Sequence, residues 1–300
     1  MTTASWRLRS LLFVPGDRPS LVAKAVAAGP DAIIVDLEDA VSPQHLADAR
    51  AAAAAELQHV EGEPTRRIVR VHAATQPAMR DDIDAVVGPW LDGIMLAKVD
   101  GSEDVEAADA AIAAREQAVG LPSGSVALLP LVESCLGLRT VYEIARASTR
   151  MVAMVFSSGE EGDFMADIGG QWTPDGLALQ YPRSRFLCDV RAAGDALVID
   201  GVCMQLERPD IVTSESRIAQ VMGFDGKLAI HPRQIDAIHE VFTPSPDEVT
   251  AARGMLASFA AGAAEGKAVV THEGRMVDPA NARVARRILA RAGVGTAGAQ

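Results

Sequence analysis

Eight short apolar runs, separated by segments of helical composition, are the feature of this sequence that most restricts its fold. Short apolar runs are typical of strands that are buried on both faces of a parallel sheet. Eight such runs in alternation with helices predict an α/β protein with a (β/α)8 TIM barrel rather than a doubly wound sheet. No GxGxxG motif follows the first run, as it would in a dinucleotide-binding fold. The predicted strands are residues 8–14, 31–37, 67–72, 93–98, 125–132, 151–157, 196–200 and 226–230.

The sequence after the eighth run breaks the alternation of strands and helices. The barrel is expected to close near residues 234–242, and the TPSPDE motif that follows predicts a turn and a helix N-terminus. We therefore expect a barrel domain at residues 1–242 and a C-terminal helical extension at residues 243–300. The elements expected in the extension are a helix at 249–264, a hairpin around 272–275 and a helix at about 279–292.

Charge and composition exclude several functional classes. The formal net charge is -12, and 28 Lys and Arg residues are scattered among 40 Asp and Glu residues. Nucleic-acid binding needs clustered cations, so no nucleic-acid partner is expected. The apolar run at 11–14 is too short for a signal peptide or a membrane span, which predicts a cytoplasmic protein without a membrane partner. The cysteines Cys135, Cys188 and Cys203 form no CxxC pattern and indicate neither disulfides nor a zinc site.

Charged and titratable residues follow nearly every predicted strand. In a TIM barrel the carboxyl ends of the strands form the functional face, so these side chains should meet there. Helix caps, ion pairs or turns are the alternative roles for some of them, namely Asp36, Glu38, Asp39, Lys98 and His231. The full set is Asp17, Arg18, Asp36, Glu38, Asp39, Arg70, His72, Lys98, Glu133, Asp163 and His231.

Glu133 and Asp163 follow two consecutive strands of one predicted βαβ unit. Both carboxylates should therefore face the crevice at the strand ends, where parallel α/β proteins bind ligands. Two carboxylates there suit a hard divalent cation such as Mg²⁺. The alternative is that Glu133 caps the next helix and that Asp163 is a solvated loop acid. An anionic substrate would be met locally by Arg18, Arg70 or Lys98.

Several longer motifs resemble one known family. They are RSLLFVPGDRP, DAIIVDLEDAV, RIVRVH, GIMLAKVD, LLPLVES, GFDGKLAIHPRQI and VFTPSPDEV. From about residue 9 to residue 291, the chain resembles the citrate lyase beta-subunit-like (CitE-like) proteins of the HpcH/HpaI aldolase superfamily. The resemblance implies a TIM barrel that uses Mg²⁺ and acyl-CoA thioesters in reversible C–C cleavage between a CoA enolate and a 2-oxo acid. It also implies a homotrimer or a multiple of trimers, in which the C-terminal extension is a lid that reaches a neighbouring subunit.

The resemblance assigns roles to individual residues. The family's metal ligands correspond to Glu133 and Asp163, and its oxo-acid-binding arginine corresponds to Arg70. Its lid aspartate corresponds to Asp278, and its contacts to CoA correspond to Phe13, Arg18, Ile230 and His231. The candidate catalytic residues are therefore Arg70, Asp278, Asp36 and Glu38. The candidate substrate-binding residues are Arg70, Glu133, Phe13, Arg18, Lys98, Ile230 and His231.

The sequence departs from the family pattern at three places. His72 stands where the family has the Asn of RVN, and Ala97 stands where it has the Pro of PKVE. The loop GEEGD replaces a G-x-x-D loop, so Glu160 or Glu161 is the alternative to Asp163 as a metal ligand. The first two differences bear on which substrate the site accepts.

The reaction expected from the resemblance is the cleavage of citramalyl-CoA to acetyl-CoA and pyruvate by a Mg²⁺-dependent acyl-CoA lyase. Arg70 would donate hydrogen bonds where the alkoxide charge develops. Lys98 is a poor Schiff-base candidate, because Asp36, Glu38 and a neighbouring acid would stabilise its charged form. A base from outside the barrel is needed, and Asp278 would supply it unless it only caps the last helix.

Other reactions remain open at this point. One is a malyl-CoA or β-methylmalyl-CoA lyase, with malate synthase-like activity if the thioester is then hydrolysed. Another is a CoA-independent class II aldolase that acts on 2-oxo acids. A third is a citrate lyase beta subunit that depends on partner subunits.

Overall fold

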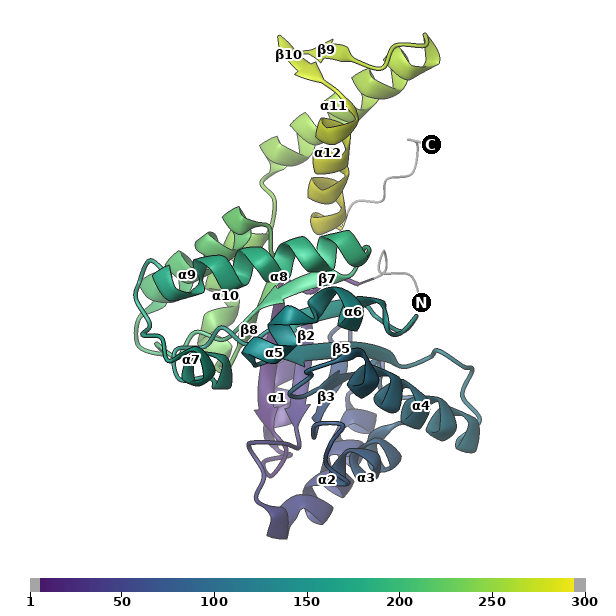
Figure 1. Cartoon of the computed structure of the whole chain (residues 1–300). Coiled ribbons are helices and arrows are strands. Elements are labelled where there is room, and N and C mark those ends of the chain that lie inside the picture. Colours follow the sequence, from purple (N-terminus) through teal and green to yellow (C-terminus); the bar gives the residue numbers. More distant parts are fainter. Residues whose placement is uncertain (1–5, 294–300) are drawn as a thin grey trace. The chain divides into compact units, whose positions relative to one another are not determined.

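In the computed structural model, which describes residues 6–293, eight parallel strands form a closed barrel in sequence order (Figure 1). The last strand pairs with the first, in a register that places Ser10 opposite Lys227. The predicted TIM barrel and its strands are confirmed, with small differences at the strand ends. The strands are β1 (Ser10–Pro15), β2 (Ala32–Asp36), β3 (Arg66–Val71), β4 (Gly93–Leu96), β5 (Ala127–Val132), β6 (Ala153–Phe156), β7 (Leu197–Asp200) and β8 (Gly226–Ala229).

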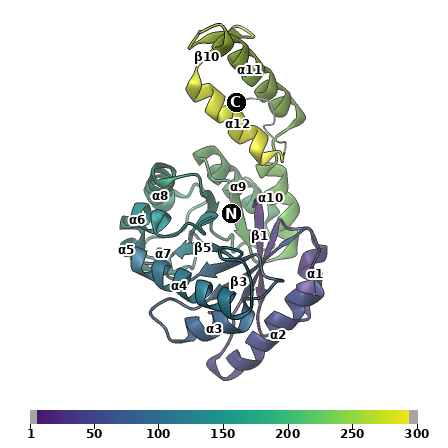
Figure 2. The same cartoon turned by 90° about the vertical axis from the view of Figure 1, so that its right-hand side faces the viewer.

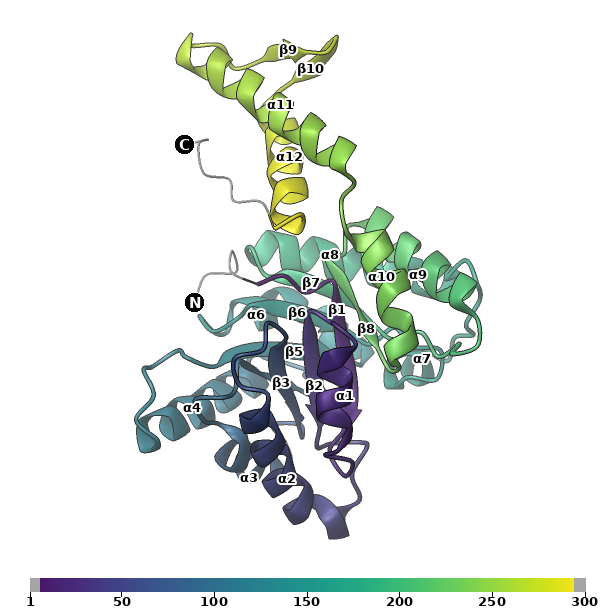
Figure 3. The same cartoon turned by 180° about the vertical axis from the view of Figure 1, so that it is seen from behind.

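Helices surround this barrel, as Figure 2 and Figure 3 show from two further sides. The strands between them are buried on both faces, which is why they read as apolar runs in the sequence. No helix within residues 6–293 has both the length and the apolar character needed to cross a membrane. The helices are α1 (Leu21–Ala27), α2 (Leu46–His59), α3 (Ala78–Val86), α4 (Ser102–Ala118), α5 (Cys135–Arg139), α6 (Val141–Arg146), α7 (Asp163–Ile168), α8 (Gln180–Ala193), α9 (Pro209–Met222) and α10 (Ile235–Phe242), with 3-10 turns η2 (Pro43–His45), η3 (Leu177–Leu179) and η4 (Pro232–Gln234).

The chain divides into two compact units, residues 1–239 and 240–300, and the division falls within α10. The second unit holds α11 (Pro246–Ala264), the antiparallel strands β9 (Val270–His272) and β10 (Arg275–Val277), and α12 (Pro279–Arg291). Ser245 and Glu248 form a capping box that begins α11, as the TPSPDE motif predicts. The two helices share a small apolar cluster made of Ala252, Leu256, Ala282, Ala285 and Leu289.

Candidate active site

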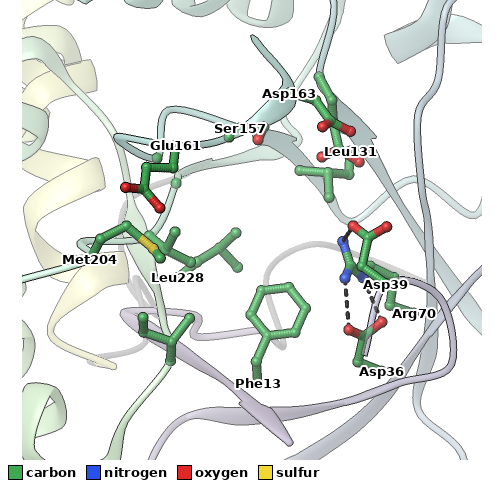
Figure 4. Close-up of a pocket in the computed structure, with 16 residues that line it drawn as sticks. Phe13, Asp36, Asp39, Arg70, Leu131, Ser157, Glu161, Asp163, Met204 and Leu228 are labelled. Atoms are coloured by element: carbon green, nitrogen blue, oxygen red, sulfur yellow. Dashed lines mark hydrogen bonds and ion pairs between the residues drawn. The ribbon is translucent and has the colours of Figure 1, made fainter. Parts of the chain in front are cut away.

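The carboxyl ends of the barrel strands enclose an open pocket of about 350 Å³ (Figure 4). One part of its wall is charged and another part is apolar. Six of the predicted site residues line it together: Phe13, Asp36, Arg70, Glu133, Asp163 and Ile230. The other charged residues of the wall are Asp39 and Glu161, and its other apolar side chains are Leu131, Val202, Met204 and Leu228.

Arg70 is held by a bidentate ion pair with Asp36, its register partner in the ladder between β2 and β3. Its Nε donates to Oδ1 of Asp36 and its Nη2 donates to Oδ2, each at 2.7 Å (Figure 4). Nη1 lies 3.2 Å from Oε2 of Glu38, and the guanidinium stands over the ring of Phe13 at 5.1 Å. Burial alone would lower the pKa of Arg70, but the bonds to Asp36 raise it above its usual value. Arg70 is therefore a fixed cation.

Glu133 directly follows β5, and its side chain is 6% exposed. Its Oε1 accepts a hydrogen bond from the backbone nitrogen of Lys98 at 3.2 Å. Burial raises the pKa of Glu133 to about 7, because Arg70 and the Lys98 amide only partly offset it and because Glu38 and Asp163 add to the rise. The carboxylate of Glu133 therefore lacks sufficient positive charge from the protein.

Lys98 lies between the acids that follow β2 and the acid that follows β6. Its Nζ lies 2.6 Å from Oε1 of Glu38, 3.2 Å from Oδ1 of Asp39 and 3.5 Å from Oδ2 of Asp163. Burial alone would lower the pKa of Lys98, but Glu38 and Asp39 raise it above its usual value, which opposes a Schiff base. Its backbone adopts a left-handed conformation with φ of 51°, a strained arrangement for a residue with a side chain.

These residues form a set that we call the pocket cluster: Asp36, Glu38, Asp39, Arg70, Lys98, Glu133 and Asp163. Five of them are carboxylates and two are cations, so the pocket cluster carries surplus negative charge. Arg70 and Lys98 are already engaged by Asp36, Glu38 and Asp39. A cation that enters the pocket would meet carboxylates that the protein leaves poorly neutralised.

The loop after β6 supplies Asp163 as the first residue of α7. Glu161 also lines the pocket, but Figure 4 shows it beside Met204, across the pocket from Arg70. Glu160 does not line the pocket, and its Oε2 accepts a hydrogen bond from Nε2 of Gln205 at 2.6 Å. Of the three acids in this loop, only Asp163 belongs to the pocket cluster.

Several alternative roles from the sequence are resolved by the contacts. Ser134 caps α5 with a hydrogen bond from the Gly137 amide at 2.9 Å, so the alternative role for Glu133, as the cap of this helix, is wrong. Asp36 and Glu38 are ion-pair partners of Arg70 and do not cap a helix, because Ser42 precedes η2.

Three candidate site residues lie outside both the pocket wall and the pocket cluster. Arg18 is exposed in the loop after β1. His231 caps η4, where its Nδ1 accepts a hydrogen bond from the Arg233 amide at 3.1 Å. Asp278 belongs to the second unit and caps α12, where its Oδ1 accepts a hydrogen bond from the Asn281 amide at 2.9 Å. The capping role that was the alternative for Asp278 is therefore observed.

His72, where the sequence departs from the family pattern, turns toward α3. Its Nδ1 lies 2.7 Å from Oδ2 of Asp82, which is fully buried and also accepts a hydrogen bond from Arg50. The hydrogen bond to Asp82 raises the pKa of His72. His72 thus supports the end of β3, two residues beyond Arg70, without lining the pocket.

One group of buried charged residues beside the pocket was missed from the sequence. Asp200 at the end of β7 binds Arg183 of α8 and Lys227 of β8, and Lys227 also lies 3.3 Å from Glu215 of α9. Lys227 was visible as a lone charge inside the apolar segment GKLAI. That signal indicates a buried ion pair, but it does not say which acid is the partner.

The donor set of the pocket fits Mg²⁺. No group of three or more His, Cys, Asp or Glu side chains within residues 6–293 converges on one metal position. Mg²⁺ commonly takes only one or two carboxylates from the protein and completes its shell with water and substrate oxygens. Glu133 and Asp163 supply two carboxylates of the same pocket, and the raised pKa of Glu133 marks an uncompensated charge.

Residues 9–232 match the family of HpcH/HpaI aldolase/citrate lyase proteins. The chain belongs to this family. Among HpcH/HpaI relatives, it is 35% identical over 284 residues to citrate lyase subunit beta of Escherichia coli (strain K12), a match that covers 95% of this chain and 93% of the relative. It is 34% identical over 284 residues to a (3S)-malyl-CoA thioesterase of Cereibacter sphaeroides, with 95% and 94% covered.

A solved HpcH/HpaI relative has the same fold over almost its whole length. It is the protein CitE from Mycobacterium tuberculosis in complex with magnesium, acetoacetate and coenzyme A. The TM-score is 0.72 at 31% sequence identity, and the match covers 96% of this chain and 98% of that protein.

Proposed function

We propose that this protein is a Mg²⁺-dependent acyl-CoA lyase that cleaves citramalyl-CoA to acetyl-CoA and pyruvate. Its membership of the HpcH/HpaI family and its likeness to CitE, crystallised with magnesium and coenzyme A, support the reaction class. The observation that carries the proposal is the pocket itself, in which the poorly compensated carboxylate of Glu133, the carboxylate of Asp163 and a fixed arginine lie beside an apolar wall.

In this proposal Glu133 and Asp163 hold the ion. When bound there, Mg²⁺ acts as a Lewis acid for the carbonyl oxygen of the 2-oxo acid. Arg70 keeps its Nε and Nη2 fork on Asp36, and its Nη1 faces Glu38 and Asp39. The second proton of Nη2 would then donate to the substrate oxygen where charge develops. Asp36 and Glu38 act by orienting Arg70, and Lys98 remains charged.

The pocket wall favours an oxo acid with one carboxylate and an apolar substituent. Among the residues that line the pocket, Arg70 is the single cation, whereas five are carboxylates: Asp36, Asp39, Glu133, Glu161 and Asp163. The second carboxylate of a dicarboxylic oxo acid would meet repulsion there. The methyl group of pyruvate would instead find the apolar side chains of Leu131, Val202 and Leu228.

The comparison with relatives supports two other functions for the same site. Similarity to a (3S)-malyl-CoA thioesterase supports a malyl-CoA or β-methylmalyl-CoA substrate, and similarity to citrate lyase subunit beta supports a subunit that works with partner subunits. A panel of citramalyl-, malyl-, β-methylmalyl- and citryl-CoA, assayed on the purified chain with and without Mg²⁺, separates these functions. We expect the highest kcat/KM for citramalyl-CoA and no turnover in EDTA. Preference for citryl-CoA, or activity without Mg²⁺, would refute the proposal.

We also propose that Asp278 is the acid–base residue that protonates the CoA enolate, delivered by the extension of a neighbouring subunit in a homotrimer. Asn caps helices as well as Asp does, so Asp278→Asn should keep α12 intact and remove the base. We expect kcat to fall about 10²-fold, with unchanged melting temperature. Mixing the variant with Glu133→Gln after dissociation should restore part of the activity.

The matched control is Ser245→Ala, which removes the cap of α11 in the same unit. It should lower the melting temperature and leave kcat within a few fold. An Asp278→Asn enzyme with normal kcat, or a fully active monomer, would contradict the shared site.

A further inference from the structure

Asp200, at the end of β7, is the centre of a buried set of charges that the pocket chemistry does not use. Arg183 donates to it twice, from Nε to Oδ1 at 2.8 Å and from Nη2 to Oδ2 at 2.9 Å. Nζ of Lys227 donates to Oδ2 at 2.9 Å and lies 3.3 Å from Oε2 of Glu215. We call these four residues, together with Ser158, the Asp200 network.

The Asp200 network is balanced in charge, with two acids and two cations. Burial would raise the pKa of Asp200, but Arg183 and Lys227 hold it below its usual range. Replacing a buried ion-pair network with well-packed apolar side chains is often neutral or stabilising. Stability alone therefore does not account for the Asp200 network. Its contacts indicate that it holds a neighbouring loop in place.

Ser158 joins the Asp200 network to the loop that carries Asp163. Its hydroxyl donates to Oδ1 of Asp200 at 2.8 Å. Its Oγ accepts from the Gly201 amide at 2.9 Å and from Nη2 of Arg183 at 3.2 Å. A hydroxyl has one proton and two lone pairs, so every hydrogen-bonding site of Ser158 is used. Ser157 and Gly159, its neighbours in the chain, both line the pocket.

The same loop, residues 157–162, packs directly against the segment after β7. A Cβ atom on Gly201 would collide with the backbone nitrogen of Ser158, and one on Gly159 would lie 2.9 Å from Cγ2 of Val202. The hydrogen bond between Glu160 and Gln205 adds a third tie between the two segments. The Gly162 amide then donates to the Gly159 carbonyl at 3.1 Å, a tight turn that leads directly to Asp163.

We infer that Asp200 and Ser158 are positioning residues, which set the place of the Asp163 carboxylate by clamping residues 157–162 onto the end of β7. The inference rests on the proposed function, because it takes Asp163 as a ligand of Mg²⁺. Groups that orient a ligand without touching the metal commonly contribute about 10- to 100-fold in metal affinity. Neither residue lines the pocket, so the effect should fall on metal binding.

The test measures the Kd of Mg²⁺ for the full chain by isothermal titration calorimetry. Ser158→Ala should raise the Kd about 10- to 100-fold, while kcat at saturating Mg²⁺ stays within a few fold of the original enzyme. The control is Ser216→Ala in α9, where an equally buried hydroxyl lies beside Glu215 and has no hydrogen-bond partner within residues 6–293. It should leave the Kd unchanged. An unchanged Kd in Ser158→Ala overturns the inference.

Asp163→Asn separates this inference from the function on which it rests. If Asp163→Asn loses Mg²⁺ binding and Ser158→Ala keeps it, the ligand assignment stands and the positioning role is wrong. If Asp163→Asn binds Mg²⁺ normally, the ligand assignment itself is wrong. Should Ser158→Ala fail to fold, Gln205→Ala is the second variant. It removes the hydrogen bond to Glu160, and the fold should tolerate it because Gln205 is partly exposed. We expect a smaller rise in Kd there, and an unchanged Kd would overturn the clamp.

Discussion

Glu133 and Asp200 are two buried carboxylates at the strand ends of one barrel, and their pKa values shift in opposite directions. Burial opposes the charge of both. At Asp200 the cations Arg183 and Lys227 outweigh burial, and the pKa falls below its usual range. At Glu133 the pKa rises to about 7, because Arg70 is engaged by Asp36 and compensates it only in part. The Asp200 network is complete without a ligand, whereas the pocket cluster needs another cation.

The largest effect is expected from removing the charge of Glu133. Glu133→Gln should lower Mg²⁺-dependent kcat at least about 10³-fold, because the Lewis-acid contribution of a bound metal amounts to several kcal/mol. Its fold should persist with an equal or higher melting temperature, since a buried carboxylate with poor compensation is removed. Steady-state kinetics and thermal denaturation measure the two results.

Glu161→Gln is the matched control for this prediction, since Glu161 lines the same pocket outside the pocket cluster. It should keep kcat within a few fold of the original enzyme. If Glu161→Gln loses Mg²⁺-dependent activity and Asp163→Asn stays active, the metal binds on the other side of the pocket, at Glu161.

Removing the charge of Asp200 should have the opposite consequence for stability. Asp200→Asn leaves Arg183 and Lys227 buried with only Glu215 to neutralise them, which should lower the free energy of unfolding by about 3–5 kcal/mol. Urea denaturation measures this value. Asp210→Asn, which breaks an exposed ion pair with Arg208, should leave the free energy of unfolding almost unchanged. If Glu133→Gln and Asp200→Asn destabilise the protein equally, the contrast between the two sites is wrong.

A smaller effect is expected from exchanging the cation of the pocket. Arg70→Lys keeps a positive charge but loses the planar guanidinium. Only the guanidinium can bind both oxygens of Asp36 and still offer a donor to the substrate. We expect kcat/KM to fall about 10²-fold, the scale of losing one preorganised donor. Arg185→Lys, at an exposed ion pair on α8, is the control and should be neutral. A loss below fivefold would show that Arg70 only holds Asp36.

The barrel could be predicted from the sequence because its strands are buried on both faces and therefore appear as apolar runs. The predicted run 151–157 contains β6, Ala153–Phe156, and extends beyond it by two residues at the start and one at the end. The strand-end residues could be predicted to meet because parallel strands place all their carboxyl ends on one face. Phe13, Arg70, Glu133 and Asp163 do share the pocket.

Side-chain partners could not be predicted in the same way. The pairing of Arg70 with Asp36 depends on the register between β2 and β3, which the sequence does not state. The Asp200 network is harder still, because it combines two strands with two helices whose packing faces are set only by the folded barrel. Asp278 differs from both, because local sequence already offered its capping contact as the alternative role, whereas its catalytic role stays a prediction.

The pH dependence of stability should separate the two carboxylates in the metal-free protein. The folded pKa of Glu133, about 7, lies above its usual value of 4.5, so the folded state binds this proton more tightly. Stability should therefore fall as pH rises from about 4.5 to 7, by at most about 1.4 kcal/mol per pH unit. The folded pKa of Asp200 lies below its usual value of 3.8, so its contribution is present above that pH and is lost as pH falls below it.

Urea denaturation in EDTA at a series of pH values tests both signs. Glu133→Gln should flatten the decline between pH 4.5 and 7, because the group that binds the extra proton is gone. Asp200→Asn should lower the free energy of unfolding over the whole pH series, and it should change the slope of the curve chiefly below pH 4. Saturating Mg²⁺ should also remove the decline in the original protein, since a bound cation stabilises the ionised form of Glu133. If the decline persists unchanged in Glu133→Gln, a different group titrates between pH 4.5 and 7. Glu133 is then not the carboxylate that needs a bound cation.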